Sequence, residues 1–153
     1  MEPLQAVEQW DLVRQLKTSF VAYPVVNAVH IASIGALLTS VTLLDLRVLG
    51  AFGSLPERPF VMLLRRLALL AFCFAIASGL ALFSVRASYY AEMPVFLGKM
   101  GLIALAGANF TLFAAVETGK PPQHRSSLRR LLAVISIVIW CAVLLCGRFI
   151  GFL

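Results

Sequence analysis

Four long runs of apolar residues, separated by short polar stretches, constrain this chain more than any other feature. The runs cover about residues 22–49, 60–85, 94–116 and 127–151. A helix that crosses the hydrocarbon core of a bilayer needs roughly 20 apolar residues, so each run is long enough for one span. Only helices and closed barrels satisfy their backbone groups within lipid. The sequence therefore predicts an all-α, integral membrane four-helix bundle.

The composition excludes a soluble domain of this size. Hydrophobic residues make up 61% of the 153 residues, and charged residues make up only 13%. A small soluble domain has too much surface to hide that apolar fraction. With their linkers, the four spans use up the length. Residues 21–153 are therefore predicted to form one membrane domain, which has the lipid bilayer as its partner and no room for a soluble catalytic domain.

Residues 1–20 are predicted to precede the spans as an amphipathic interfacial helix, with the helix itself over residues 3–18. Its apolar residues recur every three or four positions: Leu4, Val7, Trp10, Val13, Leu16 and Phe20. This spacing places one apolar stripe along a helix. Such a helix lies flat at the membrane surface with Trp10 at headgroup level. A helix that binds a partner is the alternative.

The formal charge of +6 does not indicate a nucleic-acid partner, because the basic residues flank the apolar runs, where they set membrane orientation. The segments around the ends of the first and third spans hold eight of the 13 Lys and Arg residues, and the opposite side holds five. The positive-inside rule then predicts a multi-pass protein of the bacterial inner membrane with both termini periplasmic.

His30 is the strongest candidate for chemistry, because it is the only histidine inside an apolar run. It lies roughly 12 Å below the outer boundary of the first span, where an ionisable group is costly and usually functional. The alternative is a structural role, in which a neutral imidazole only forms a hydrogen bond with a neighbouring helix, through Asn27 or Ser33 on its own helix face. Lys99 lies roughly 7–8 Å into the third span. It either snorkels to the interface or lies buried near His30.

A second set of charged residues lies near the cytoplasmic ends of the spans. Asp45 and Arg47 are two residues apart and do not share a helix face, so each needs a partner on another helix. The arginines at the same level are Arg65, Arg66, Arg129 and Arg130. The pattern predicts a structural ion-pair network between helices. Binding of an anionic cofactor group or lipid headgroup is the functional alternative.

Three further features concern helix packing. Asn109, in the third span, is predicted to hydrogen-bond a neighbouring helix, and the four-residue spacing of Ala75 and Gly79 predicts close helix packing. Spans two and four both begin with Leu-Arg-Arg-Leu, at residues 64–67 and 128–131. Spans one and three each carry one ionisable residue near the outer end. Two parallel halves would explain this repeat, and chance is the alternative.

Several motifs occur in a recognisable order. They are Tyr23-Pro24, Asn27-x-x-His30-x-x-Ser33-x-Gly35, Leu44-Asp45-Leu46-Arg47-x-x-Gly50, Tyr89-Tyr90 and Phe96-x-x-Lys99. The pattern resembles a family of small bacterial inner-membrane proteins of unknown function, the DUF6644 type. The similarity is clearest over residues 20–115 and implies no known activity.

A more distant similarity concerns the order of three residues: a histidine in span one, an arginine near the start of span two and a lysine in span three. This order looks like the HemJ-type protoporphyrinogen oxidases and the CopD-like copper-resistance domains. The resemblance implies a haem- or metal-lined pocket between spans one and three, with His30 and Lys99 in it. HemJ-type proteins have Leu-Pro-Arg-Leu after span one, where this chain has residues 44–47, Leu-Asp-Leu-Arg. The oxidase activity is therefore not carried over.

Three functions follow as hypotheses, and whether the chain is an enzyme stays open. The leading one is a b-type haem-binding protein, or a haem- or quinone-associated subunit of a redox complex. In that reading His30 is the metal ligand, Lys99 is a second ligand or the partner of a cofactor carboxylate, and Asn27 completes the cofactor-binding residues. The alternatives are a non-catalytic accessory or scaffold subunit, with other membrane subunits or further copies as partners, and a small metal transporter or permeation domain.

Overall fold

Four long helices dominate the computed structural model, which describes residues 2–118 and 124–152. They are α3 (Ala22–Val48), α4 (Glu57–Ser84), α6 (Pro94–Thr118) and α7 (His124–Ile150). Each contains a stretch that is long and apolar enough to cross a membrane. No strand occurs among the described residues. The predicted fold class, an all-α membrane bundle, is confirmed.

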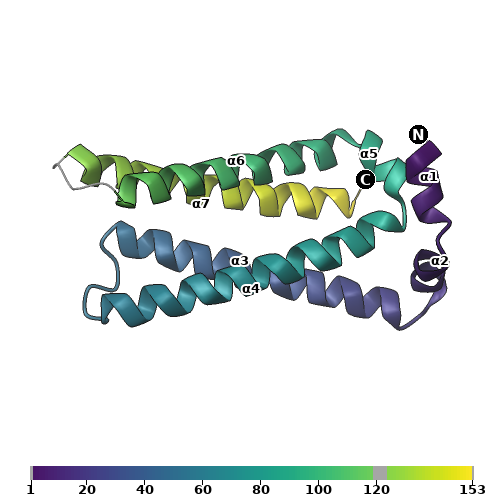
Figure 1. Ribbon diagram of the computed structural model, residues 1–153, viewed down its shortest axis with the longest axis horizontal. Coiled ribbons are helices and arrows are strands. Elements are labelled where there is room, and N and C mark those ends of the chain that lie inside the picture. Colours follow the sequence, from purple (N-terminus) through teal and green to yellow (C-terminus); the bar gives the residue numbers. More distant parts are fainter. Residues whose placement is uncertain (1, 119–123, 153) are drawn as a thin grey trace.

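The long helices form two antiparallel hairpins, α3–α4 and α6–α7, which pack against each other through α3 and α7 (Figure 1). The second hairpin has a compact apolar core of Ala106, Ile139 and Val143, covered by Leu102, Ile103 and Trp140. Large apolar side chains also cover the outside of the helices, as at Leu80 and Phe110, which are 63% and 64% exposed. An apolar exterior is what a lipid-facing surface requires.

The linker between α3 and α4 is a tight connection. Gly50 follows the end of α3 with a φ of 105°, a left-handed conformation that favours glycine. Pro56 directly precedes α4 and starts that helix without requiring a backbone donor. We call this end of the bundle the linker end.

The N-terminal region forms two short helices rather than the predicted single helix over residues 3–18. They are α1 (Glu2–Glu8) and α2 (Asp11–Thr18), and the chain is extended at Trp10, with φ of −61° and ψ of 139°. The break lets each helix find its own partner. Helix α2 packs on α3, while α1 packs on α5 (Ala87–Glu92), the short helix between α4 and α6. Trp10 stays 62% exposed.

Helices α1, α2 and α5 gather at the end of the bundle where both chain termini lie, which we call the α2 end (Figure 1). Glu8 Oε1 accepts a hydrogen bond of 2.8 Å from the backbone N–H of Ser88, which joins α1 to α5. Phe83, Tyr90 and Phe96 stack against one another across α4, α5 and α6. The α2 end is therefore closed by a cap of short helices and aromatic rings.

Candidate functional site

His30 is held by a serine of the neighbouring helix that the sequence analysis did not identify. Its Nδ1 lies 3.0 Å from Ser78 Oγ in α4. Ser78 Oγ also lies 2.5 Å from the carbonyl oxygen of Phe74. A carbonyl has no hydrogen to donate, so the single hydroxyl hydrogen of Ser78 goes to Phe74. Ser78 can then only accept from the ring, so this contact favours the tautomer of the neutral imidazole with its hydrogen on Nδ1, and the Ala75 backbone is a further hydrogen-bond partner of the ring.

This assignment determines what the other ring nitrogen can do. A neutral imidazole has one N–H and one nitrogen with a free lone pair. With Nδ1 donating to Ser78, Nε2 carries the lone pair and can bind a metal or accept a proton. The expected partners on the same helix play no part in this. Ser33 Oγ donates to the Val29 carbonyl at 2.7 Å, and Asn27 is exposed, with no hydrogen bond to any described residue.

A glycine of α4 gives the imidazole its space. A Cβ atom at Gly79 would lie 3.0 Å from His30 Cε1, tighter than most such contacts, so the ring would have to move by a few tenths of an ångström to admit it. The close packing predicted from Ala75 and Gly79 is thus found, but it brings an imidazole against the α4 backbone. A Ser-Gly pair inside an apolar run was the sequence signal for this contact.

Lys99 comes close enough to His30 for the two groups to interact electrostatically. The two side chains nevertheless meet different helices. The imidazole lies against α4, whereas Lys99 Nζ lies 3.4 Å from the position that a Cβ of Gly147 would occupy in α7. Lys99 is half-buried rather than extended into solvent. The structure therefore brings the predicted pair into one region without pointing both groups at one centre.

At the linker end, Asp45 is only 9% exposed, and its hydrogen-bond partner is Ser136 of α7. That partner is a hydroxyl group rather than the predicted arginine. Arg47 instead donates to the linker, to the carbonyl oxygens of Ala51, Phe52 and Leu55. Its position two residues after Asp45 turns it toward the linker, whose carbonyls lack helical partners. Arg47 therefore closes the linker rather than joining helices.

The other arginines of the predicted ion-pair network lie apart from Asp45. Arg65 and Arg66 are exposed on α4. The guanidinium of Arg129 lies over the Phe113 ring, 5.7 Å from its centroid, and contributes a cation–π contact between α7 and α6. Nearby, Asn109 Nδ2 donates to the Leu132 carbonyl at 3.2 Å, as predicted for an interhelical hydrogen bond.

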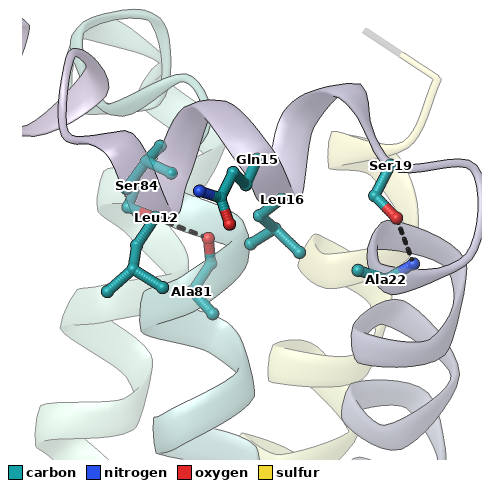
Figure 2. A pocket seen from close by; sticks show the side chains of 8 residues that line it. Leu12, Gln15, Leu16, Ser19, Ala22, Ala81 and Ser84 are labelled. Carbon is teal, nitrogen blue, oxygen red and sulfur yellow. Dashed lines mark hydrogen bonds between the residues drawn. The ribbon is translucent and has the colours of Figure 1, made fainter.

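A cavity of about 510 Å³ opens between α2 and the neighbouring ends of α3 and α4 (Figure 2). The apolar part of its wall includes Leu12, Leu16 and Ala81. Its hydroxyl groups are already used, because Ser19 Oγ accepts from the Ala22 N–H at 3.0 Å and Ser84 Oγ donates to the Ala81 carbonyl at 2.7 Å. The cavity therefore offers a ligand mainly apolar surface.

A second cavity of about 260 Å³ continues along the α3–α4 interface. Ala81 lines both cavities, and Ser78 lines the second one. We call the two cavities together the α3–α4 groove; the first lies at the α2 end, and the second includes Ser78, the serine that holds His30. Neither cavity lies between α3 and α6, where the resemblance implied a pocket.

Comparison of the chain with protein-family models, with curated proteins and with solved structures found no match. The resemblances described from the sequence therefore stay predictions. Function has to be inferred from the placement of the side chains themselves.

Proposed function

We propose that the chain is a b-type haem-binding membrane protein in which His30 binds the iron through Nε2. The Ser78 contact is the observation that carries the proposal. Metal-binding histidines usually donate their second ring N–H to a fixed acceptor, which sets the tautomer and the ring orientation. Ser78 is such an acceptor, and Gly79 admits the ring to it.

The available ligands favour a porphyrin over a bare metal ion. Among the described residues, no three His, Cys, Asp or Glu side chains come together in a way that could hold a metal. A porphyrin brings its own equatorial nitrogens and needs only axial ligands from the protein. Bound at His30, a haem would supply one-electron transfer. The positive charge of Lys99, in the same region, suits a haem propionate.

The proposal includes a location. We place the protein in the bacterial inner membrane with the α2 end toward the periplasm, as the distribution of lysine and arginine favours. Both termini lie at this end (Figure 1). His30 then lies in the outer half of the membrane, where it is suited to exchange electrons with a partner on the periplasmic side.

An absorption spectrum of the protein, purified in mild detergent and supplied with haem, tests the proposal. We expect a Soret band in the wild type, its loss in His30→Ala, and about 10–100-fold weaker haem binding in Ser78→Ala. Ser84→Ala is the matched control, because Ser84 lies in the same helix and hydrogen-bonds only its own backbone. A wild-type spectrum without a Soret band after haem addition would exclude the proposal.

The α3–α4 groove supports quinone binding as a second candidate function. Its apolar walls suit an isoprenoid chain, and Ser78 places a hydroxyl beside His30 at its inner end. We expect quinone to be recovered by solvent extraction of the purified protein, and Ala77→Phe, which fills the groove, to reduce that amount several-fold. Ala108→Phe, on α6 and away from the groove, is the control. Equal quinone content in all three proteins would exclude this candidate.

A further inference from the structure

Asp45 is a buried carboxyl group whose surroundings do not satisfy it. The residue is 9% exposed and lies within the apolar span of α3. Its Oδ2 atom is buried and has no hydrogen-bond partner among the described residues. The Ser136 hydroxyl, from a residue that is 8% exposed in α7, supplies a hydrogen bond to the carboxyl.

The ionised form of Asp45 is the less satisfied of its two protonation states. An ionised carboxylate at this place has only the neutral Ser136 hydroxyl as its hydrogen-bond partner among the described residues, which is costly away from water. A neutral carboxyl group can carry its O–H on the oxygen that faces Ser136, whose hydroxyl can accept it, and only Oδ2 is then left without a partner among the described residues. A bound cation, either a metal ion or a proton, would therefore complete the site.

One basic side chain near Asp45 is engaged elsewhere. Arg47, on the same helix, donates to the linker carbonyls. On the helices packed against α3, the described ionisable groups toward this end are Glu57, Arg58, Arg65 and Arg66 of α4 and Arg129 and Arg130 of α7. The hydrogen bond that the Asp45 carboxyl receives comes from the Ser136 hydroxyl instead.

We propose that Asp45 and Ser136 form a binding site for a monovalent cation, either Na⁺ or a proton, between α3 and α7. One carboxylate neutralises one positive charge, and carboxylate and hydroxyl oxygens are hard donors of the kind that small cations prefer. A divalent ion would need further acidic groups, and none gather here among the described residues.

The position of the site gives the cation a structural consequence. The hairpins meet through α3 and α7, and Asp45 and Ser136 face each other across this contact. Occupancy of the site therefore strengthens the joint between the hairpins. The site is independent of the proposed haem, which concerns His30 and α4.

Thermal unfolding of the full chain in detergent, without added haem and at constant ionic strength, tests the proposal. One arm replaces NaCl with choline chloride at fixed pH, and the other lowers the pH without Na⁺. A rise of about 5 °C with saturating Na⁺ identifies Na⁺, and a rise confined to lower pH identifies the proton. In either case Asp45→Asn loses the response, and Ser136→Ala needs about tenfold more cation.

Asp11→Asn is the matched control, because Asp11 is an exposed carboxylate of α2 and should leave the response unchanged. Equal responses of the wild type and Asp45→Asn in both arms would overturn the proposal. If Asp45→Asn does not fold, the infrared carboxyl bands of the wild type and of Ser136→Ala decide. The site is supported if a carboxyl band shifts with Na⁺ or pH, and if the wild type needs a lower cation concentration for this shift than Ser136→Ala does. Bands that do not respond, or that respond identically in the two proteins, overturn the proposal.

Discussion

The α3–α4 and α6–α7 hairpins each place one ionisable side chain of their first helix against a glycine of their second helix. His30 Cε1 lies 3.0 Å from the position of a Gly79 Cβ, and Lys99 Nζ lies 3.4 Å from that of a Gly147 Cβ. The imidazole is rigid and is held by Ser78, whereas the amine ends a flexible chain. One arrangement fixes a chemical group in place, and the other leaves it free to move.

The buried surface of α3–α4 is also more polar than that of α6–α7. Among the described residues, helices α3 and α4 bury Ser33, Ser40 and Ser78, whereas α6 and α7 bury Ser136 and a cluster of Ala106, Ile139 and Val143. Helix association in lipid depends on close packing and on hydrogen bonds between helices. We therefore expect α6–α7 to contribute mainly packing stability, and α3–α4 to position polar groups at some cost in stability.

The largest expected effect is in the apolar core of α6–α7. Ile139 is 5% exposed, and Ile139→Ala should lower the free energy of unfolding by about 2–4 kcal/mol, through lost contacts and the cavity left behind. Reversible unfolding in mixed micelles measures this. Ile135→Ala is the control, since Ile135 is 38% exposed on the same helix. Equal losses for the two variants would remove the contrast between the hairpins.

A methyl group at Gly79 should have the next largest effect. Gly79→Ala shifts the His30 ring relative to α4 by a few tenths of an ångström, because its Cε1 atom lies 3.0 Å from the new Cβ. We expect a loss of about 1–3 kcal/mol in unfolding free energy from this overpacking, together with loss of any haem spectrum. Gly35→Ala in α3 is the control, as a Cβ there meets nothing within 4 Å. If both variants behave alike, the imidazole does not occupy its assigned place.

The same substitution in the other hairpin should hardly change the unfolding free energy. In Gly147→Ala the new Cβ meets Lys99 Nζ at 3.4 Å, and the flexible lysine can move aside. The change in unfolding free energy should stay within about 0.5 kcal/mol, as for substitutions outside packed contacts. A loss as large as that of Gly79→Ala would show that Lys99 is held as firmly as His30.

The smallest expected effect concerns the cap that links the hairpins through α5. The Ser88 N–H lowers the pKa of Glu8 below its ordinary value of 4.5. The carboxylate therefore stabilises the α1–α5 contact above pH 4.5, and this contribution is lost as the pH falls through the lowered pKa. Protection of the Ser88 amide against hydrogen exchange should fall over that range in the wild type and not in Glu8→Gln. Glu2→Gln, an exposed site, should behave as the wild type does.

The parts of the fold that depend on local sequence were predictable, because a span is defined by the length of an apolar run. The four long helices therefore lie where the apolar runs predicted them. Asn109 was also predictable, since an amide inside a span needs a partner on another helix. The division of the N-terminal helix at Trp10 was not, because its cause lies in α5, far along the chain.

The candidate site was predictable only in part. Burial of an ionisable group singled out His30, but its partner Ser78 lies 48 residues away, and the Ser78-Gly79 pair in that apolar run does not indicate which helix it faces. Arg47 was expected to pair across helices, yet the open carbonyls of the linker lie nearer to it than any acid. Partners of this kind depend on which helices pack together, and the pattern of an apolar run does not indicate which helix will be its neighbour.

The contact between Glu8 and Ser88 spans 80 residues and so has a consequence for biosynthesis. Helix α1 leaves the ribosome well before α5, so it cannot dock until the α3–α4 hairpin has been inserted and α5 has followed it. Until then its apolar face can bind only the membrane surface. The amphipathic character of this segment thus has two uses. During synthesis it holds the segment in the headgroup layer, and in the finished protein it lets α1 bind α5 at the α2 end of the bundle.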